Sequence, residues 1–326
     1  MHVSVVICSH TSDRYESLIA AIESVVSQTY DDRSVVVVVD GNPQLKSQLD
    51  GAVGTNDDVF VHLQEENKGL LASRNTGASI ADGDIVAFLD DDAVAHADWL
   101  AELVACYTDM PTEQQTTHRI PADWEYPLAV GGRMCPRWVA GKPEWLPAEF
   151  YWLIGVTHRG FPEGPGEVRN TPGSNLSFRR PVFEALGGFN TQIGGRSGDK
   201  QLQGGETELC VRLRNEFHTG VYYTPDARVD HRIFAYRTRP WWLIKRAFWQ
   251  GYSKRGMAVL GPDDRSGTAE EGAFLKQLCT RFVPSRLRTL ASSPSVDAFA
   301  QLCMLCLLTI AVGSGYAYGV FAWRSS

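Results

Sequence analysis

The segment Ile85-Val86-Ala87-Phe88-Leu89-Asp90-Asp91-Asp92 joins a run of apolar residues to three carboxylates. A short continuous apolar run is typical of a strand that is buried on both faces of a parallel sheet. Three like charges at its end are costly unless a cation neutralises them, and Mg²⁺ and Mn²⁺ prefer carboxylate ligands. Asp90 and Asp92 point the same way in extended backbone, with Asp91 opposite. The segment therefore favours a metal site over a solvated acidic loop, which does not explain why the carboxylates follow a buried strand.

Three similar apolar runs precede this strand in the chain: Val3–Cys8, Val35–Val39 and Val59–Leu63. Apolar residues at helical spacing lie between or after the strands, in segments 18–26, 70–80 and 99–104. Strands that alternate with helices indicate right-handed crossovers and an α/β fold with a doubly wound sheet. In such sheets ligands bind at the carboxyl ends of the strands, so we look there for functional side chains.

Polar residues follow each of these strands. The second strand ends in Asp40-Gly41-Asn42-Pro43, and the third is followed by Glu65-Glu66-Asn67-Lys68-Gly69. The glycine-rich fingerprint G-x-G-x-x-G does not follow the first strand, and the chain has no P-loop lysine motif. These observations disfavour a dinucleotide-dependent dehydrogenase and a P-loop nucleotidase.

Four motifs together resemble the nucleotide-sugar-binding half of the family-2 inverting glycosyltransferases: the strand Val3–Cys8, the turn Asp40-Gly41-Asn42, the segment 67–77 and the triplet Asp90-Asp91-Asp92. That resemblance implies the glycosyltransferase-A fold, a Rossmann-like α/β fold with a mixed sheet, and a divalent cation, Mg²⁺ or Mn²⁺. It also implies roles for individual residues. Carboxylates can accept the imide N–H of uracil, and arginine pairs with phosphate. The resemblance places Asp40 at the uracil, Arg74 near the base or diphosphate, Asp90 near the ribose or sugar, and Asp92 at the metal. Asn67 and Lys68 are also expected to bind the nucleotide sugar.

A second block continues the resemblance. The segments 172–180 and 186–189 are similar to the acceptor side of the family, and the stretch Gly204-Gly205-Glu206-Thr207-Glu208-Leu209 aligns with its catalytic-base motif. The family has Asp where this chain has Glu206, which we expect to take the proton of the acceptor hydroxyl. Glu208 is the alternative base. His231 stands where many relatives have a histidine that could bind the metal or the diphosphate.

The C-terminal part of the chain has a different composition. Residues 1–163 hold 10 Lys and Arg against 25 Asp and Glu, whereas residues 164–326 hold 21 against 13. Residues 231–290 combine 12 basic residues with several Trp, Phe and Tyr, and residues 298–323 contain no charge. Basic and aromatic residues beside an apolar segment favour a membrane interface on the cytoplasmic face. Nucleic-acid binding is disfavoured because the acidic N-terminal half would repel a polyanion.

We therefore predict four segments. Residues 1–110 form the nucleotide-sugar-binding half and 111–235 the acceptor-side half of a catalytic domain, with the donor-sugar pocket between Thr112 and Pro172. Residues 236–297 form a basic and aromatic membrane-proximal segment, and 298–323 a transmembrane or interfacial helix.

The Asp40–Pro43 turn, the Asp13–Glu16 segment and the apolar C-terminus resemble archaeal hexuronosyltransferases that extend a dolichyl-phosphate-linked sugar in S-layer N-glycosylation. The resemblance implies transfer of glucuronate from a UDP-sugar to a lipid-linked acceptor at the cell membrane. Two other enzymatic hypotheses stay open, a dolichyl-phosphate sugar synthase and a cell-surface polysaccharide glycosyltransferase. A catalytically silent, membrane-bound nucleotide-sugar-binding protein is the alternative from another class.

Overall fold

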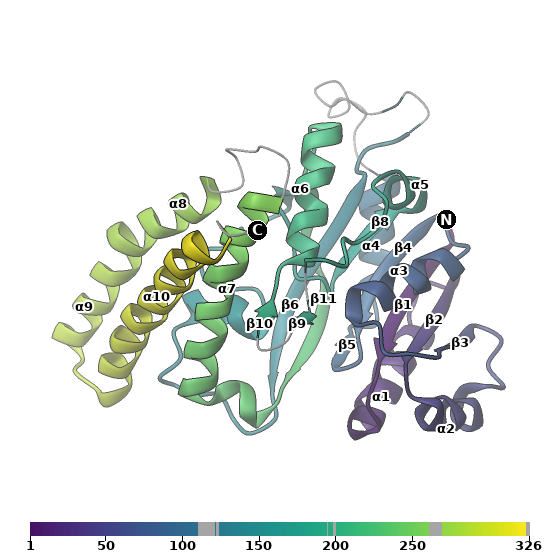
Figure 1. Ribbon diagram of the computed structural model, residues 1–326, viewed down its shortest axis with the longest axis horizontal. Helices are drawn as coiled ribbons and strands as arrows, with labels where there is room; N and C mark the ends of the chain where they lie inside the picture. The colour runs from purple at the N-terminus through teal and green to yellow at the C-terminus, as the bar shows by residue number, and fades with distance from the viewer. Residues whose placement is uncertain (110–120, 122–123, 194, 198–199, 261–268, 324–326) are drawn as a thin grey trace. The chain divides into compact units, whose positions relative to one another are not determined.

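The computed structural model describes residues 1–109, 121, 124–193, 195–197, 200–260 and 269–323 (Figure 1). Residues 112–120, part of the expected donor-sugar pocket, lie outside that range. The described residues belong to two compact units. Unit 1 is drawn from Met1–Pro136, Glu163–Gly195 and Gly205–Arg232, and unit 2 from Arg137–Pro162, Arg196–Gly204 and Ile233–Ser326. The four-segment division of the sequence stays a prediction.

Four parallel strands form the first half of the main sheet in unit 1. They stand in the order β3-β2-β1-β4, and Val5 on β1 aligns with Val35 on β2 and with Ala87 on β4. All seven residues of β1 are buried, which explains its continuous apolar sequence. The bounds are β1 (Val3–Ser9), β2 (Arg33–Asp40), β3 (Val59–Gln64) and β4 (Ile85–Asp90). The four apolar runs are therefore confirmed as strands.

Helices connect these strands as the periodicity predicts, with one addition. The helix α2 was not predicted, because only Leu45 and Leu49 of its eleven residues are buried. It begins where Asn42 accepts a hydrogen bond from the Leu45 N–H (3.0 Å) and Pro43 occupies the first turn. The helices and the short 3₁₀ turn of this half are η1 (Ser12–Arg14), α1 (Tyr15–Val26), α2 (Pro43–Val53), α3 (Leu70–Ile80) and α4 (Trp99–Thr108).

The second half of the main sheet is largely antiparallel. From β4 the order continues β8-β6-β11-β5, and β7 pairs with β11. The fully buried Asn175 joins this half together: its side-chain amide donates to the carbonyls of Arg133 and Ala227 and accepts from Trp99 Nε1. The elements are β5 (Ala93–Ala95), β6 (Ala129–Trp138), β7 (Gly166–Val168), β8 (Leu176–Arg179), α5 (Arg180–Ala185), α6 (Gly205–Phe217) and β11 (Val221–Ile233). The expected mixed α/β sheet is confirmed.

Unit 2 is mostly helical. Its longest helix, α10, contains most of the uncharged stretch 298–323, and within the described residues it is the helix long and apolar enough to cross a membrane. A separate two-stranded sheet pairs β9 with β10. The elements are η3 (Ala148–Ile154), β9 (Gly195–Ser197), β10 (Lys200–Leu202), η4 (Ala235–Thr238), α7 (Pro240–Leu260), α8 (Ala269–Gln277), the π-helical turn η6 (Leu278–Phe282), α9 (Val283–Ser292) and α10 (Val296–Ala322).

Candidate active site

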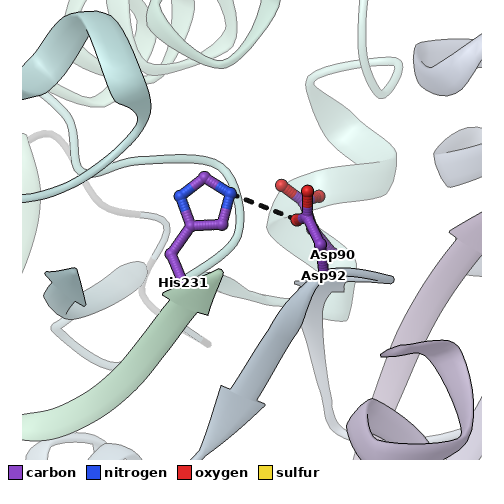
Figure 2. Close-up of side chains that lie close together, drawn as sticks. All are labelled: Asp90, Asp92 and His231. Atoms are coloured by element: carbon purple, nitrogen blue, oxygen red, sulfur yellow. Dashed lines mark ion pairs between the residues drawn. The ribbon is translucent and has the colours of Figure 1, made fainter. Parts of the chain in front are cut away.

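Two carboxylates and one imidazole converge at the carboxyl end of β4, and we call these residues the active-end cluster: Asp90, Asp92 and His231 (Figure 2). One ligand atom of each lies within 4.8 Å of the other two. His231 reaches this point because β11 pairs with β5 and places it opposite Ala93. Its Nε2 lies 3.1 Å from Asp92 Oδ1, and both side chains are almost fully buried.

Asp91 does not join the cluster: it lies with Asp92 in the turn between β4 and β5, and its side chain has other partners. It accepts a hydrogen bond from Ser9 Oγ (2.6 Å) and one from Arg14 Nη1 (2.9 Å). Burial raises the pKa of Asp91, and Arg14 and Ser9 partly oppose that rise. Ser9 and Arg14 were not predicted to support the site, although their position just after the first strand was the available signal.

The active-end cluster fits a divalent cation. Buried carboxylates need a positive partner, and two carboxylate oxygens with one imidazole nitrogen form a donor set that Mn²⁺ accepts. Mg²⁺ prefers oxygen ligands, whereas Mn²⁺ also accepts imidazole nitrogen. Asp92 also lies 3.4 Å from Arg14 Nη1 through its other oxygen. The cluster can therefore hold a metal ion through Asp90, Asp92 and His231.

Asp40 organises the loop that precedes α3. Its carboxylate is buried and accepts hydrogen bonds from the backbone N–H of Lys68 (2.8 Å), the N–H of Gly69 (2.9 Å) and the side-chain amide of Gln64 (2.7 Å). The neighbouring Gly41 has a positive φ of 68°. A Cβ at that position would lie 2.6 Å from the Asn67 nitrogen, so glycine permits the loop to approach β2.

The side chains of Asn67 and Lys68 are exposed, at the carboxyl ends of the parallel strands. Asp40 therefore lies behind the loop and fixes its backbone, while the side chains of the loop stay open to a ligand. One oxygen of Asp40, Oδ2, accepts a single protein hydrogen bond among the described residues and keeps capacity for another donor.

Arg74 is buried and is not a surface cation. Its Nη2 lies 2.6 Å from Asp90 Oδ1, and its guanidinium lies 5.6 Å from the centre of the Phe189 ring. Burial works against its charge, but Asp90, Cys8 and Glu206 outweigh that effect and raise the pKa of Arg74. Arg74 therefore connects to the active-end cluster through Asp90.

The two glutamates at the start of α6 have different surroundings. Glu208 is buried, and its two oxygens accept hydrogen bonds from Arg212 Nε and Nη2, both at 2.8 Å. Glu206 is half-buried in the first turn of α6, where the helix dipole favours a carboxylate. It is also close enough to Arg74 to affect that pKa. Glu206 is thus the carboxylate that combines exposure with proximity to the residues around Asp90.

Sequence comparison identifies the class of protein that this fold and site define. The profile of "Glycosyl transferase family 2" matches residues 4–187, and the chain belongs to that family. It is also 44% identical over 320 residues to "Glucosyl-dolichyl phosphate glucuronosyltransferase" of Haloferax volcanii, a match that covers 98% of this chain and 96% of the relative. The family resemblance found in the sequence motifs is therefore confirmed.

Solved structures share the fold. A mannosyltransferase from Pyrobaculum calidifontis, in complex with GDP-Man and Mn²⁺, superimposes with a TM-score of 0.58 at 18% identity, covering 97% of this chain and 87% of that one. S. aureus TarS in complex with UDP-GlcNAc gives a TM-score of 0.53 at 14% identity, covering 100% and 92%. At these identities the likeness concerns the fold alone, which confirms the glycosyltransferase-A architecture.

Proposed function

We propose that the chain is an inverting, Mn²⁺-dependent glucuronosyltransferase that uses UDP-glucuronate as donor and glucosyl-dolichyl phosphate as acceptor. The observation that carries the proposal is the 44% identity to the Haloferax volcanii relative over nearly the whole of both chains. The convergence of Asp90, Asp92 and His231 supports the metal dependence. We place the reaction in protein N-glycosylation of the S-layer type, with the catalytic domain at the cytoplasmic face of the cell membrane.

The donor would bind at the carboxyl ends of β2, β3 and β4. The loop that Asp40 holds presents Asn67 and Lys68 to the nucleotide, and the free capacity of Asp40 Oδ2 suits the imide N–H of uracil. Arg74 is a positioning residue, since its ion pair with Asp90 orients that carboxylate toward the sugar side of the nucleotide.

The transfer needs one proton acceptor and one way to neutralise the leaving diphosphate. Glu206 would take the proton from the glucose hydroxyl while that oxygen bonds to C1 of glucuronate and the bond from C1 to the diphosphate oxygen breaks, which inverts C1. Asp90, Asp92 and His231 would hold the cation. When bound, the cation supplies positive charge to the departing diphosphate. His231 also contacts Asp92 and so fixes its orientation.

Lipid extraction tests this proposal directly. Membranes that contain the protein are incubated with Mn²⁺, radiolabelled UDP-glucuronate and glucosyl-dolichyl phosphate, and label in the chloroform phase is counted. The proposal expects label that is lost in Asp92→Asn and retained in Asp32→Asn, whose carboxylate is 56% exposed and lies outside the cluster. Label on bare dolichyl phosphate instead would identify a dolichyl-phosphate sugar synthase. UDP binding without any transfer to these or other lipid-linked acceptors would favour the silent binding protein.

A further inference from the structure

The helix α10 has two apolar faces, one packed inside unit 2 and one exposed. Its small residues Ala311, Gly315 and Gly319 are buried within unit 2. The opposite face holds large apolar side chains that the protein leaves open, among them Phe299 (58% exposed), Ile310 (63%) and Phe321 (71%). Residues four and seven positions apart lie on one side of a helix, so the open residues form a continuous stripe.

Close backbone contact holds α10 against α7. A Cβ at Gly315 would lie 1.8 Å from the Phe248 carbonyl oxygen, and a Cβ at Gly251 would lie 1.9 Å from the Val312 carbonyl oxygen. Only glycine permits helices to approach so closely. The rings of Tyr252 and Tyr318 also pack against each other, with centres 5.8 Å apart. The two helices therefore form one packed layer of unit 2 (Figure 1).

The helix α7 is too polar to accompany α10 across a bilayer. It contains Lys245, Arg246, Lys254 and Arg255, and the Cβ of Arg255 lies next to Gly319. Lys254 pairs with Glu271 of α8 and also lies over the Trp152 ring. If α10 crossed the hydrocarbon core with these contacts intact, the cations beside it would enter the core as well. Such a position is costly for charged side chains.

Exposed cations also occur on the helical segments that precede α10. Lys276, Arg281 and Arg288 are exposed on α8, η6 and α9, and the exposed Leu275 and Leu287 lie beside them in the sequence. The chain between α8 and α10 is therefore both basic and partly apolar at its surface. Anionic headgroups attract cations at a membrane surface, and exposed leucines can enter the region below the headgroups.

We propose that α10 lies in the plane of one leaflet and does not cross the membrane. Its open stripe faces the acyl chains, its glycine face stays on α7, and the cations of α8, η6 and α9 meet anionic headgroups. The occupant of the open face is thus a lipid surface. This inference deepens the membrane association in the proposed function. Its test uses no sugar transfer, so either proposal can fail without the other.

Protease accessibility in sealed vesicles tests the topology. The full chain is produced with one epitope tag at each end and bound to preformed vesicles of phosphatidylglycerol and phosphatidylcholine, and parallel inverted membrane vesicles are taken from the expressing cells. In-plane binding predicts that externally added protease removes both tags from both preparations. Protection of the C-terminal tag until detergent is added, with loss of the N-terminal tag, would show a spanning helix and overturn the proposal.

Flotation with the same vesicles tests the lipid-facing stripe. Ile310→Glu is expected to lower the bound fraction about tenfold or more, because it places a charge in the stripe. Phe60→Glu is the matched control, since Phe60 is 54% exposed on β3 of unit 1, and it should bind as the unchanged protein does. Phe299→Ser repeats the test if Ile310→Glu fails to fold by circular dichroism. Equal binding of the stripe variants and the control, or a native protein that does not float with vesicles, contradicts the proposal.

Discussion

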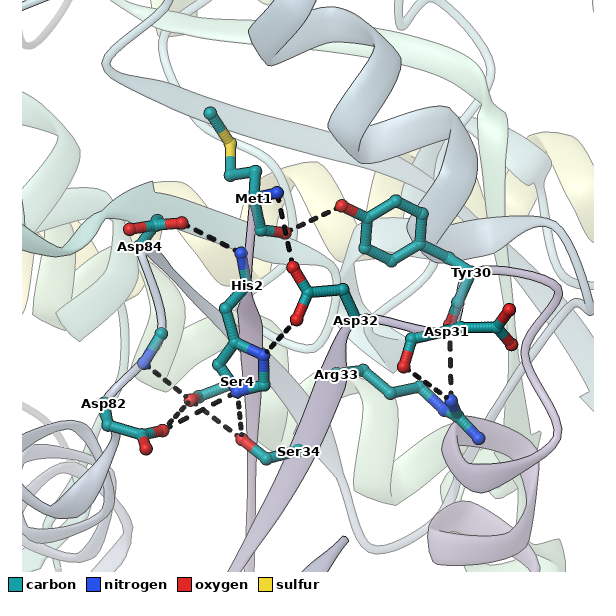
Figure 3. Close-up of polar contacts among 11 residues, drawn as sticks. Met1, His2, Ser4, Tyr30, Asp31, Asp32, Arg33, Ser34, Asp82 and Asp84 are labelled. Atoms are coloured by element: carbon teal, nitrogen blue, oxygen red, sulfur yellow. Dashed lines mark hydrogen bonds and ion pairs between the residues drawn. The ribbon is translucent and has the colours of Figure 1, made fainter.

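The main sheet carries clusters of Asp and His at both ends of its parallel strands, and only one of them has the properties of a site. The active-end cluster follows β4. The other, which we call the amino-end cluster, consists of His2, Asp32, Asp82 and Asp84 before β1, β2 and β4 (Figure 3). Similar residue types therefore occur at both ends, and their identity alone does not mark the functional end.

The two clusters differ in burial and in how their polar atoms are used. In the amino-end cluster His2 Nδ1 bonds to Asp32 (2.8 Å), its Nε2 bonds to Ser34 (3.0 Å), and its backbone N–H donates to Asp84 (2.9 Å). The side chains of Asp32 and Asp82 are 56% and 86% exposed. The side chains of Asp92 and His231, in contrast, are 2% and 5% exposed, and their ligand atoms lie within 4.8 Å of each other and of one from Asp90. The convergence of three ligand atoms, two of them on buried side chains, rather than the residue types alone, makes the active-end cluster the candidate metal site.

Replacing the proposed base should have the largest effect. Glu206→Gln keeps the shape of the side chain but cannot accept the proton, so we expect transfer to fall by about 10²- to 10⁴-fold. Initial rates of label transfer measure it, with UDP binding as a check that the donor site is intact. Glu208→Gln is the paired variant. Its loss of charge weakens the bond to Arg212, so we expect a lower melting temperature and little change in the transfer rate. A normal rate in Glu206→Gln would assign the base elsewhere.

Replacing the proposed metal ligand Asp92 should have the next largest effect, and it compares the two clusters directly. Asp92→Asn should reduce transfer by about 10²- to 10³-fold, because it removes a carboxylate from the cation that neutralises the leaving diphosphate. Asp32→Asn, the counterpart in the amino-end cluster, should stay within about twofold of the unchanged protein. Titration of activity with Mn²⁺ measures both. Similar losses in the two variants would contradict the distinction between the clusters.

Replacing the histidine of each cluster, His231 or His2, should have smaller effects on transfer. His231→Gln leaves two carboxylate ligands in place, so we expect a loss of about 10- to 100-fold and a higher Mn²⁺ concentration for half-maximal activity. His2→Gln should change neither quantity. If excess Mn²⁺ does not restore any activity to His231→Gln, a direct role at the diphosphate would replace the metal-ligand role.

The smallest effect concerns acid stability. The hydrogen bond from His2 lowers the pKa of Asp32 below its usual 3.8. Its contribution to folding is present above that pH and is lost as the pH falls through the folded-state value. Because Asp32 is exposed, removing the hydrogen bond with His2→Gln should lower the melting temperature by about 1 °C or less at neutral pH. Thermal unfolding between about pH 2 and 7 measures the difference, which should vanish at the acid end.

The pKa of the buried Asp91, next to the active-end cluster, shifts in the opposite direction from that of Asp32. Its pKa is raised, so the folded protein binds a proton there more readily than the unfolded chain does. Ionisation of Asp91 therefore opposes folding as the pH rises above about 3.8. Carboxylates at the two ends of one sheet thus respond to pH in opposite directions.

The sequence predicted what depends on local pattern. The four parallel strands could be found because Val, Ile and Phe occupy consecutive buried positions. Asp90 and Asp92 could be singled out as candidate metal ligands because they lie at and just after the end of such a strand, and that role stays a prediction. The helix α2 was missed because its surface is polar on most sides, and the strand β6 was missed because Pro, Gly and Trp around it are typical of loops.

Long-range placement could not be derived from local pattern. His231 meets Asp92 only because β11 pairs antiparallel with β5, about 140 residues earlier in the chain. The family resemblance, rather than the residue itself, had pointed to His231. The same limit applies to Arg14, which reaches Asp91 across 77 positions, and to Arg74, whose burial against Phe189 depends on a distant segment.

The hydrogen bonds from the Lys68 and Gly69 amides to Asp40 have a consequence for exchange with solvent. Both amides belong to a loop whose side chains include an exposed lysine, yet they donate to a buried carboxylate. Amide hydrogens held in this way exchange only when the local structure opens. Hydrogen–deuterium exchange should therefore find slow amides at these two positions, although the side chains of Asn67 and Lys68 are exposed.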